Sequence, residues 1–201
     1  MPRGPEARRL GLHASRGVVF RLSMLFAMDA FAGGFIVQSI MAYWFYLRFG
    51  ASEASLGVIF FGANVLAGVS ALLAARIAKR IGLLNTMVFT HAPSSLLLCL
   101  VPLMPVLWLA IAVLLLRFSI SQMDVPTRQA YTMSAVAQDE RSAAAGVTSI
   151  ARSIGAAVSP ALSGFLLAVP ALMNAPFLLA GGLKITYDAL LYRSFRRTSP
   201  N

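Results

Sequence analysis

The chain has 201 residues, of which 58% are hydrophobic and only 12% are charged, and its formal net charge is +10. Soluble domains contain about 45–50% apolar and about 25% charged residues, so this composition excludes a disordered chain, a disulfide-rich scaffold and an ordinary soluble enzyme. The mean hydropathy of +0.76 indicates that the apolar excess extends along the whole chain.

Six apolar segments follow one another, and each is long enough to cross a bilayer as a helix, which takes about 20 mainly apolar residues. We expect an all-α polytopic membrane protein. Its spans are predicted at about 19–47, 55–76, 82–104, 106–135, 142–169 and 171–193. Residues 19–195 then form one six-helix transmembrane domain between a basic cytoplasmic tail at 1–18 and a cytoplasmic tail at 196–201.

The positions of the basic residues predict the orientation, because Lys and Arg are retained on the cytoplasmic side of a membrane. With both termini inside, thirteen basic residues lie on the cytoplasmic side: Arg3, Arg8, Arg9, Arg16, Arg21, Arg76, Lys79, Arg80, Arg128, Arg141, Arg193, Arg196 and Arg197. Arg48 alone lies on the outer side. A nucleic-acid surface would need its basic residues on one contiguous face, so this scatter argues against nucleic acid as a partner. We expect a protein of the cell membrane, plasma or inner.

Small residues recur every four positions in two of the spans: Ala63, Ala67, Ala71 and Ala75 in the second, and Gly155, Ser159 and Ser163 in the fifth. Membrane helices approach each other most closely through such residues, since lipid gives apolar side chains no reason to prefer one another. Close helix contacts are therefore predicted at both stripes.

The first span contains one acid, Asp29, near the middle of the membrane. An isolated carboxyl group at that depth loses its hydration and favours its neutral form, which suits a proton-coupling site. The alternative is an acid that only bonds a neighbouring helix. Gln38 points the opposite way on a regular helix, and shares a pathway with Asp29 only if Gly33-Gly34 opens the helix. Asn64 in the second span is a further pathway candidate, although a lone Asn often only joins helices.

The fourth span carries Arg117, Ser121, Asp124 and Arg128 on one narrow stripe, with Pro126 expected to kink the helix. A charged stripe faces protein or water and not lipid. We interpret Arg117 as a pathway or gating residue, because it lies deep in the span. Asp124 and Arg128 are interpreted as an ion pair near the cytoplasmic end.

Four further ionisable residues lie inside the later spans. Arg152 is predicted to pair with Asp124 across a helix contact, while Lys184 and Asp188, four residues apart on one helix, are predicted to pair with each other. His91 has no second ligand at a spacing typical of metal sites, so neither a metal nor another cofactor is expected. No nucleophile, phosphate-loop or paired-acid motif is present, so an enzyme is not expected.

The later spans and one loop resemble the major facilitator superfamily. The residues that carry the resemblance are Arg117-Phe118, Pro126, Tyr131, Glu140-Arg141, Gly146, Gly155, Ser159-Pro160 and Ser163-Gly164, together with the loop Ala75–Gly82. The loop departs from the family pattern because Ala75 stands where an Asp is expected and Ala78 where a Gly is expected. Since this loop degenerates more often in the C-terminal half, the chain resembles that half, built as two inverted three-helix units.

The resemblance implies secondary active transport of a small molecule by alternating access, with the substrate between two six-helix halves. Asp29, Gln38 and Arg117 would line the cavity, while Arg76, Lys79 and Arg80 would belong to a cytoplasmic gate. Proton coupling is expected through Asp29, and the substrate stays undetermined. The alternative is a scaffold or regulatory subunit that transports nothing.

Family members have about twelve helices, whereas this chain supplies six. Three explanations stay open: a truncated or mis-started reading frame, a half-transporter that forms a homodimer, or a subunit that pairs with a separate N-terminal half. A polar cavity facing lipid would be unstable, so a second six-helix half is expected beside this one.

Overall fold

The protein is a bundle of long helices. The computed structural model describes residues 11–196, and most of the two predicted tails lies outside this range. The α-helices are α1 (Arg16–Gly34), α2 (Gln38–Phe49), α3 (Glu53–Ile81), α4 (Leu83–Leu100), α5 (Leu107–Ser121), α6 (Asp124–Ser134), α7 (Arg141–Ala168) and α8 (Ala175–Phe195). Short 3-10 turns lie at η2 (Val101–Leu103), η3 (Gln138–Glu140) and η4 (Pro170–Leu172). Residues 11–196 contain no strand, as predicted for the all-α class.

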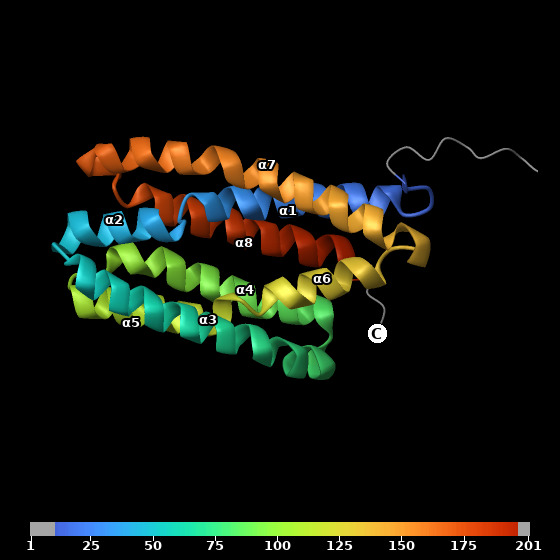
Figure 1. Ribbon diagram of the computed structural model, residues 1–201, viewed down its shortest axis with the longest axis horizontal. Helices are drawn as coiled ribbons and strands as arrows, with labels where there is room; N and C mark the ends of the chain where they lie inside the picture. The colour runs from blue at the N-terminus through green and yellow to red at the C-terminus, as the bar shows by residue number, and fades with distance from the viewer. Residues whose placement is uncertain (1–10, 197–201) are drawn as a thin grey trace, which may run out of the picture.

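Five segments of the described chain are long and apolar enough to cross a membrane: Arg16–Phe49, Glu53–Ile81, Leu83–Leu103, Leu107–Ser134 and Gln138–Ala168. They correspond to the first five predicted spans. α8 is 21 residues long and runs along the same axis (Figure 1). It is not among the five because Lys184 and Asp188 make it less apolar than the others. Length and hydropathy thus support five of the six predicted spans.

The helices form two groups that run along the long axis of the molecule (Figure 1). α1 packs closely against α7 and also against α8, while α3 packs against α5 and α6. α4 joins the two groups, since it contacts α8 on one side and α5 and α6 on the other. The start of α1, the turn between α3 and α4, and the end of α8 lie at the same end of the bundle. This end, here called the basic end, carries Arg76, Lys79 and Arg80.

The first span is interrupted after Gly34, and α2 begins at Gln38. Gly34 packs so closely on α7 that an added Cβ would lie 2.1 Å from the Ser159 hydroxyl oxygen. An interruption frees backbone groups that need new partners inside a membrane. The Ser163 hydroxyl on α7 donates to the Phe35 carbonyl at 2.9 Å and satisfies one of them. The opening that was postulated at the glycine pair is therefore present.

The fourth span is interrupted at Gln122 and Met123, between α5 and α6. Pro126 explains the position, because a proline ring clashes with the carbonyl four residues earlier, which here belongs to Gln122. The Gln122 backbone N–H donates to the Ser70 hydroxyl on α3 at 3.2 Å. The predicted kink is thus a full break, placed one turn before the proline.

Small residues form the closest helix contacts. An added Cβ at Gly155 on α7 would lie 2.3 Å from the Ala27 carbonyl oxygen of α1, so the predicted stripe on the fifth span is confirmed. The prediction for the second span is only partly correct. The buried small residues of α3 are Ala63, Ala67, Ser70 and Ala74. A strict four-residue spacing drifts away from the 3.6-residue helical period, which leaves Ala75 exposed.

Glu140 joins the start of α1 to the start of α7. Its carboxylate is fully buried and accepts backbone N–H groups from His13, Ala14 and Ser15, the last at 2.9 Å. The His13 imidazole lies 2.8 Å from the Asp139 carboxylate. These contacts hold the segment before α1 beside α7 at the basic end.

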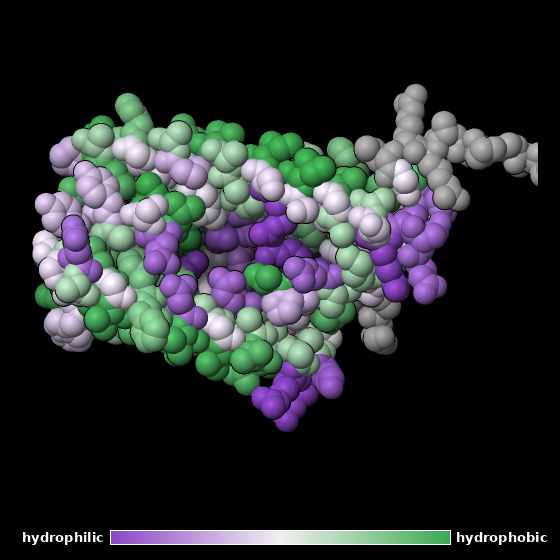
Figure 2. Space-filling model, in the orientation of Figure 1, coloured by the Kyte–Doolittle hydropathy of each residue, from purple (hydrophilic) through white to green (hydrophobic). Residues whose placement is uncertain are grey.

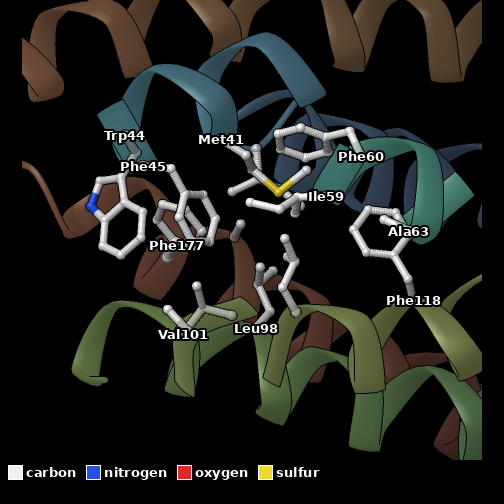
Figure 3. Close-up of a cluster of buried hydrophobic side chains, with 14 of the residues drawn as sticks. Met41, Trp44, Phe45, Ile59, Phe60, Ala63, Leu98, Val101, Phe118 and Phe177 are labelled. Atoms are coloured by element: carbon white, nitrogen blue, oxygen red, sulfur yellow. The ribbon is translucent and has the colours of Figure 1, made fainter. Parts of the chain in front are cut away.

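Two groups of buried apolar side chains lie one beyond the other along α4 and α8. The first, here called the apolar cluster, lies far from the basic end and includes Trp44, Phe45, Phe60, Leu98 and Phe177 (Figure 3). The second lies nearer the basic end and includes Leu22, Phe26, Met87, Tyr187 and Leu191. The buried polar residues His91 on α4 and Lys184 on α8 fall between the two groups in the sequence of each helix. A polar layer therefore separates two apolar ones.

Candidate functional site

Asp29 is the centre of the polar layer. Its carboxylate is 4% exposed and contacts cations from three other helices. Lys184 Nζ on α8 lies 2.7 Å from Oδ1, and Arg128 Nη1 on α6 lies 2.8 Å from Oδ2. Arg152 on α7 is more distant, with Nη1 3.8 Å from Oδ2. Asp29 is therefore a hub of cationic contacts, and the expectation that it is isolated is wrong.

Arg128 bridges two acids. Its Nη2 lies 2.6 Å from Asp124 Oδ2, one turn earlier on α6, while Nη1 binds Asp29. A planar guanidinium group with several donors suits this double contact. The predicted pair of Asp124 and Arg128 is present, but it extends to α1. Arg152 was predicted to pair with Asp124, but the carboxylate that it approaches is that of Asp29, through the same Oδ2 that Arg128 binds.

His91 on α4 lies between two carboxylates. Its Nδ1 lies 2.9 Å from Asp188 Oδ1, and its Nε2 lies 3.5 Å from both Asp29 Oδ1 and Lys184 Nζ. The predicted pair of Lys184 and Asp188 is wrong. Both side chains are buried on α8, but each contacts a different helix. Lys184 binds Asp29 on α1, and Asp188 binds His91 on α4. Six residues thus form what is here called the charge cluster: Asp29, His91, Asp124, Arg128, Lys184 and Asp188.

The charge cluster opens into a cavity of about 290 Å³ between α1, α4, α5, α6, α7 and α8. Figure 2 shows a hollow lined by hydrophilic residues on the flank of the molecule. Asp29, Asp124 and Arg128 line the cavity together with Arg117 and Arg152. A larger cavity of about 660 Å³ shares Arg128 and Arg152 with it and continues between α6 and α7 towards the basic end.

Arg117 lies apart from the cluster's ion pairs. It is 8% exposed, and no carboxylate of the described residues lies within 4.0 Å of its guanidinium group. The group lies 5.0 Å from the ring centroid of the neighbouring Phe118, and its Nε has no hydrogen-bond partner. The structure therefore places Arg117 at the cavity as a buried, unpaired cation.

Gln38 and Asn64 lie beside this cavity and not in it. The Asn64 side-chain amide donates to Gln38 Oε1 at 3.2 Å, and both residues are exposed. Gln38 lines an adjoining cavity of about 260 Å³ that shares Gly33, Arg117 and Lys184 with the first. After the break between α1 and α2, Gln38 thus lines a cavity next to that of Asp29, while Asn64 lines neither of the two.

The three residues assigned to a cytoplasmic gate are not part of the charge cluster. Arg76, Lys79 and Arg80 are exposed at the end of α3, and none of them forms an ion pair with a described residue. Lys79 lines a separate small cavity beside Pro126. This loop therefore stays a predicted gate, at the basic end and away from Asp29.

Sequence reasoning did not find the roles of His91, Lys184 and Asp188. Each residue had a simple local explanation. The one feature that could have indicated a common site is that all three are ionisable residues near the middle of a membrane span. Their convergence also brings ligand atoms of Asp29, His91 and Asp124 within 4.8 Å of one another. The Arg128 guanidinium and the Lys184 ammonium groups already occupy these carboxylates, which is unfavourable for a metal cation.

Comparisons with known proteins place this architecture in a family. The chain matches the Major Facilitator Superfamily over residues 22–201. It is 26% identical over 175 residues to the uncharacterized membrane protein YJR124C of Saccharomyces cerevisiae, an alignment that covers 87% of this chain and 39% of the yeast protein. The chain thus spans about two fifths of the length of that relative. No solved structure matches. Because the family match covers most of the chain, and the family consists of multi-pass membrane transporters, this protein belongs to the major facilitator superfamily.

Proposed function

We propose that the chain is half of a secondary active transporter that couples the movement of a small molecule to protons by alternating access. The observation that supports this proposal is a buried charge cluster, open to a cavity, in the middle of helices that suit a membrane. Intramembrane ionisable residues are costly, and they typically mark substrate or ion pathways. The basic end faces the cytoplasm in this proposal, with both termini on that side of the cell membrane.

The packing supports two inverted three-helix units. α1 with α2 corresponds to α5 with α6, α3 corresponds to α7, and α4 corresponds to α8. Under this exchange the contact of α1 with α7 becomes the contact of α5 with α3, and both are present. Each interrupted span is also bonded at its break by a serine of the equivalent neighbour, Ser163 for the first and Ser70 for the fourth. Interrupted helices at matching positions of two repeats are typical of transporter binding sites.

The proton step falls on Asp29 and His91. A proton on the Asp29 carboxylate weakens its contacts with Lys184 and Arg128, and so loosens α1 from α8 and α6. The His91 ring, between Asp29 and Asp188, is placed to pass that proton from one carboxylate to the other. Protonation thereby changes which helices are held together, which is the requirement for coupling a proton to a conformational change.

A second six-helix half completes the site in this proposal. The hollow lined by hydrophilic residues opens on the flank of the bundle and not at one of its ends (Figure 2). Charged groups facing lipid are costly, so this flank requires cover. A homodimer and a pair with a separate half both provide it.

Reconstitution of the intact chain in liposomes that contain a pH-sensitive dye tests the function. A panel of small anions, cations and neutral solutes is added outside, and a coupled substrate changes the internal pH unless a protonophore is present. The D29N variant is expected to abolish this pH change, because Asn cannot carry the proton, while D29E restores part of it.

Melting temperatures of D29N and D29E are measured in the same lipid, so that unfolding is separated from uncoupling. Proton-coupled movement of a solute at the wild-type rate in folded D29N contradicts the role of Asp29. Absence of any coupled solute in the wild type contradicts proton-coupled transport and favours the scaffold or inactive-half alternative.

A further inference from the structure

The ionisable side chains that line the central cavity do not balance. Four of them are cationic and two are carboxylates: Arg117, Arg128, Arg152, Lys184, Asp29 and Asp124. Asp188 is bonded to His91 and does not line the cavity. Apart from His91, the cavity walls carry two more positive than negative charges. An uncompensated excess of this kind inside a membrane protein favours the binding of an anion.

The excess is localised on two arginines. Arg128 and Lys184 are compensated, because Lys184 lies 2.7 Å from Asp29, and Arg128 lies 2.8 Å from Asp29 and 2.6 Å from Asp124. Arg117 is more than nine-tenths buried, and its Nε has no hydrogen-bond partner. Arg152 Nη1 is likewise buried without a hydrogen bond, and its nearest carboxylate oxygen, 3.8 Å away, is the one already bound by Arg128.

The two arginines approach the cavity from different helices. Arg117 lies on α5 and Arg152 on α7, and the neutral donors Ser94, Ser121 and Gln122 also line the space. A guanidinium group presents several N–H donors in a planar fork that matches the oxygens of a carboxylate or phosphate. The cavity volume of about 290 Å³ suits a small solute.

We propose that the cavity binds a small oxyanion with two negative charges, a dicarboxylate or a phosphate, and that Arg117 and Arg152 are its ligands. This proposal rests on the proposed transport function and specifies its substrate class. It also separates the roles of the three arginines that line the cavity, because Arg128 organises the charge cluster, while Arg117 and Arg152 are available to an anion.

Direct binding tests the proposal without transport. The intact chain is placed in nanodiscs of phosphatidylcholine, and succinate, inorganic phosphate, acetate and choline are titrated while heat and melting temperature are recorded. Succinate or phosphate is expected to bind and to raise the melting temperature, acetate to bind more weakly, and choline not to bind. R117Q is expected to weaken anion binding at least tenfold and R117K less, because lysine keeps the charge but loses the fork.

Two controls separate binding from structure. R48Q removes the same charge from an exposed site at the far end of α2, so it is expected to bind anions as the wild type does. Unliganded R117Q is expected to melt at or above the wild-type temperature, because it removes an unpaired buried cation. A lower melting temperature in R117Q and R117K alike indicates a structural ion pair and overturns the assignment.

The remaining outcomes are equally decisive. Binding of choline in place of the anions, absence of anion binding, or an equal loss in R48Q overturns the proposal. Nanodiscs of phosphatidylglycerol distinguish a lipid headgroup from a free solute: if the anionic lipid raises the melting temperature through Arg117 and blocks succinate, the ligand is the headgroup. Anion binding without a coupled pH change supports the anion site and contradicts proton coupling. Proton-coupled movement of a cation supports proton coupling and contradicts the anion site.

Discussion

The apolar cluster and the charge cluster lie on the same helices, yet different forces hold them. In the apolar cluster, Leu98 of α4 and Phe177 of α8 pack without any polar contact. About two turns along the same helices, His91 and Lys184 contact Asp29. Lipid is as apolar as leucine, so the first region depends on shape and dispersion, whereas the second depends on each buried charge having its partner.

This difference predicts unequal sensitivity to substitution. A lost methyl group in the apolar cluster leaves a small void, while a lost charge in the other cluster leaves its partners unpaired in a low-dielectric interior. Four substitutions test this comparison, in order of decreasing expected effect.

R128M is expected to have the largest effect, because it leaves Asp124 without its partner and Asp29 with one close cation fewer. Removing one partner of a buried ion pair costs about 3–5 kcal/mol. The free energy of unfolding is measured by titration with a denaturing detergent. The double variant R128M/D124L should recover part of the loss, and simple additivity of the two changes would argue against a coupled pair.

G155A is expected to push α7 away from α1, because the added Cβ would lie 2.3 Å from the Ala27 carbonyl oxygen. Ala27 is two residues before Asp29 on α1. Overpacking costs about 1–3 kcal/mol. G164A on the same helix is the matched control, since its Cβ would meet no atom within 4 Å. The same detergent titration should show a loss of stability in G155A alone, and equal losses would mean that helix contact is not the cause.

L98A removes a fully buried side chain from the apolar cluster. The unfolded chain also remains in an apolar environment, so the transfer contribution to the loss of stability is absent. The cavity that the substitution leaves is then expected to lower the unfolding free energy by about 1–2 kcal/mol. A loss as large as that of R128M would contradict the comparison between the two clusters. L96A, at an exposed position of the same helix, should leave the unfolding free energy unchanged.

S163A is expected to have the smallest effect, because it removes one hydrogen bond to the Phe35 carbonyl at the break of the first span. Side-chain hydrogen bonds between membrane helices contribute about 0.6 kcal/mol on average. S119A, whose hydroxyl bonds its own helix at an exposed position, is the control. Hydrogen exchange at residues 35–38 should rise in S163A and not in S119A.

The membrane class and five of the spans could be predicted from the sequence. Hydrophobicity over 20 residues is a local property, and a helix satisfies its own backbone, so the bilayer leaves few alternatives. The break at Gly33-Gly34 and the kink at Pro126 were also local signals. α8 is the instructive exception, since the charges that make it part of the site also reduce its apolar character.

Which charges meet depends on how the helices pack. Up to 155 positions of the chain separate the members of the charge cluster, as for Asp29 and Lys184. Neighbours in the sequence therefore do not reveal these contacts. Local pairing rules therefore predicted the contact between Asp124 and Arg128 correctly and the pair of Lys184 and Asp188 wrongly. A buried charge takes the partner that lowers its desolvation cost most, and the packing of the helices determines where that partner lies. That charges would be buried follows from the amino-acid sequence, because they lie within apolar segments, while the fold makes Asp29 their hub and leaves Arg117 without an ion pair.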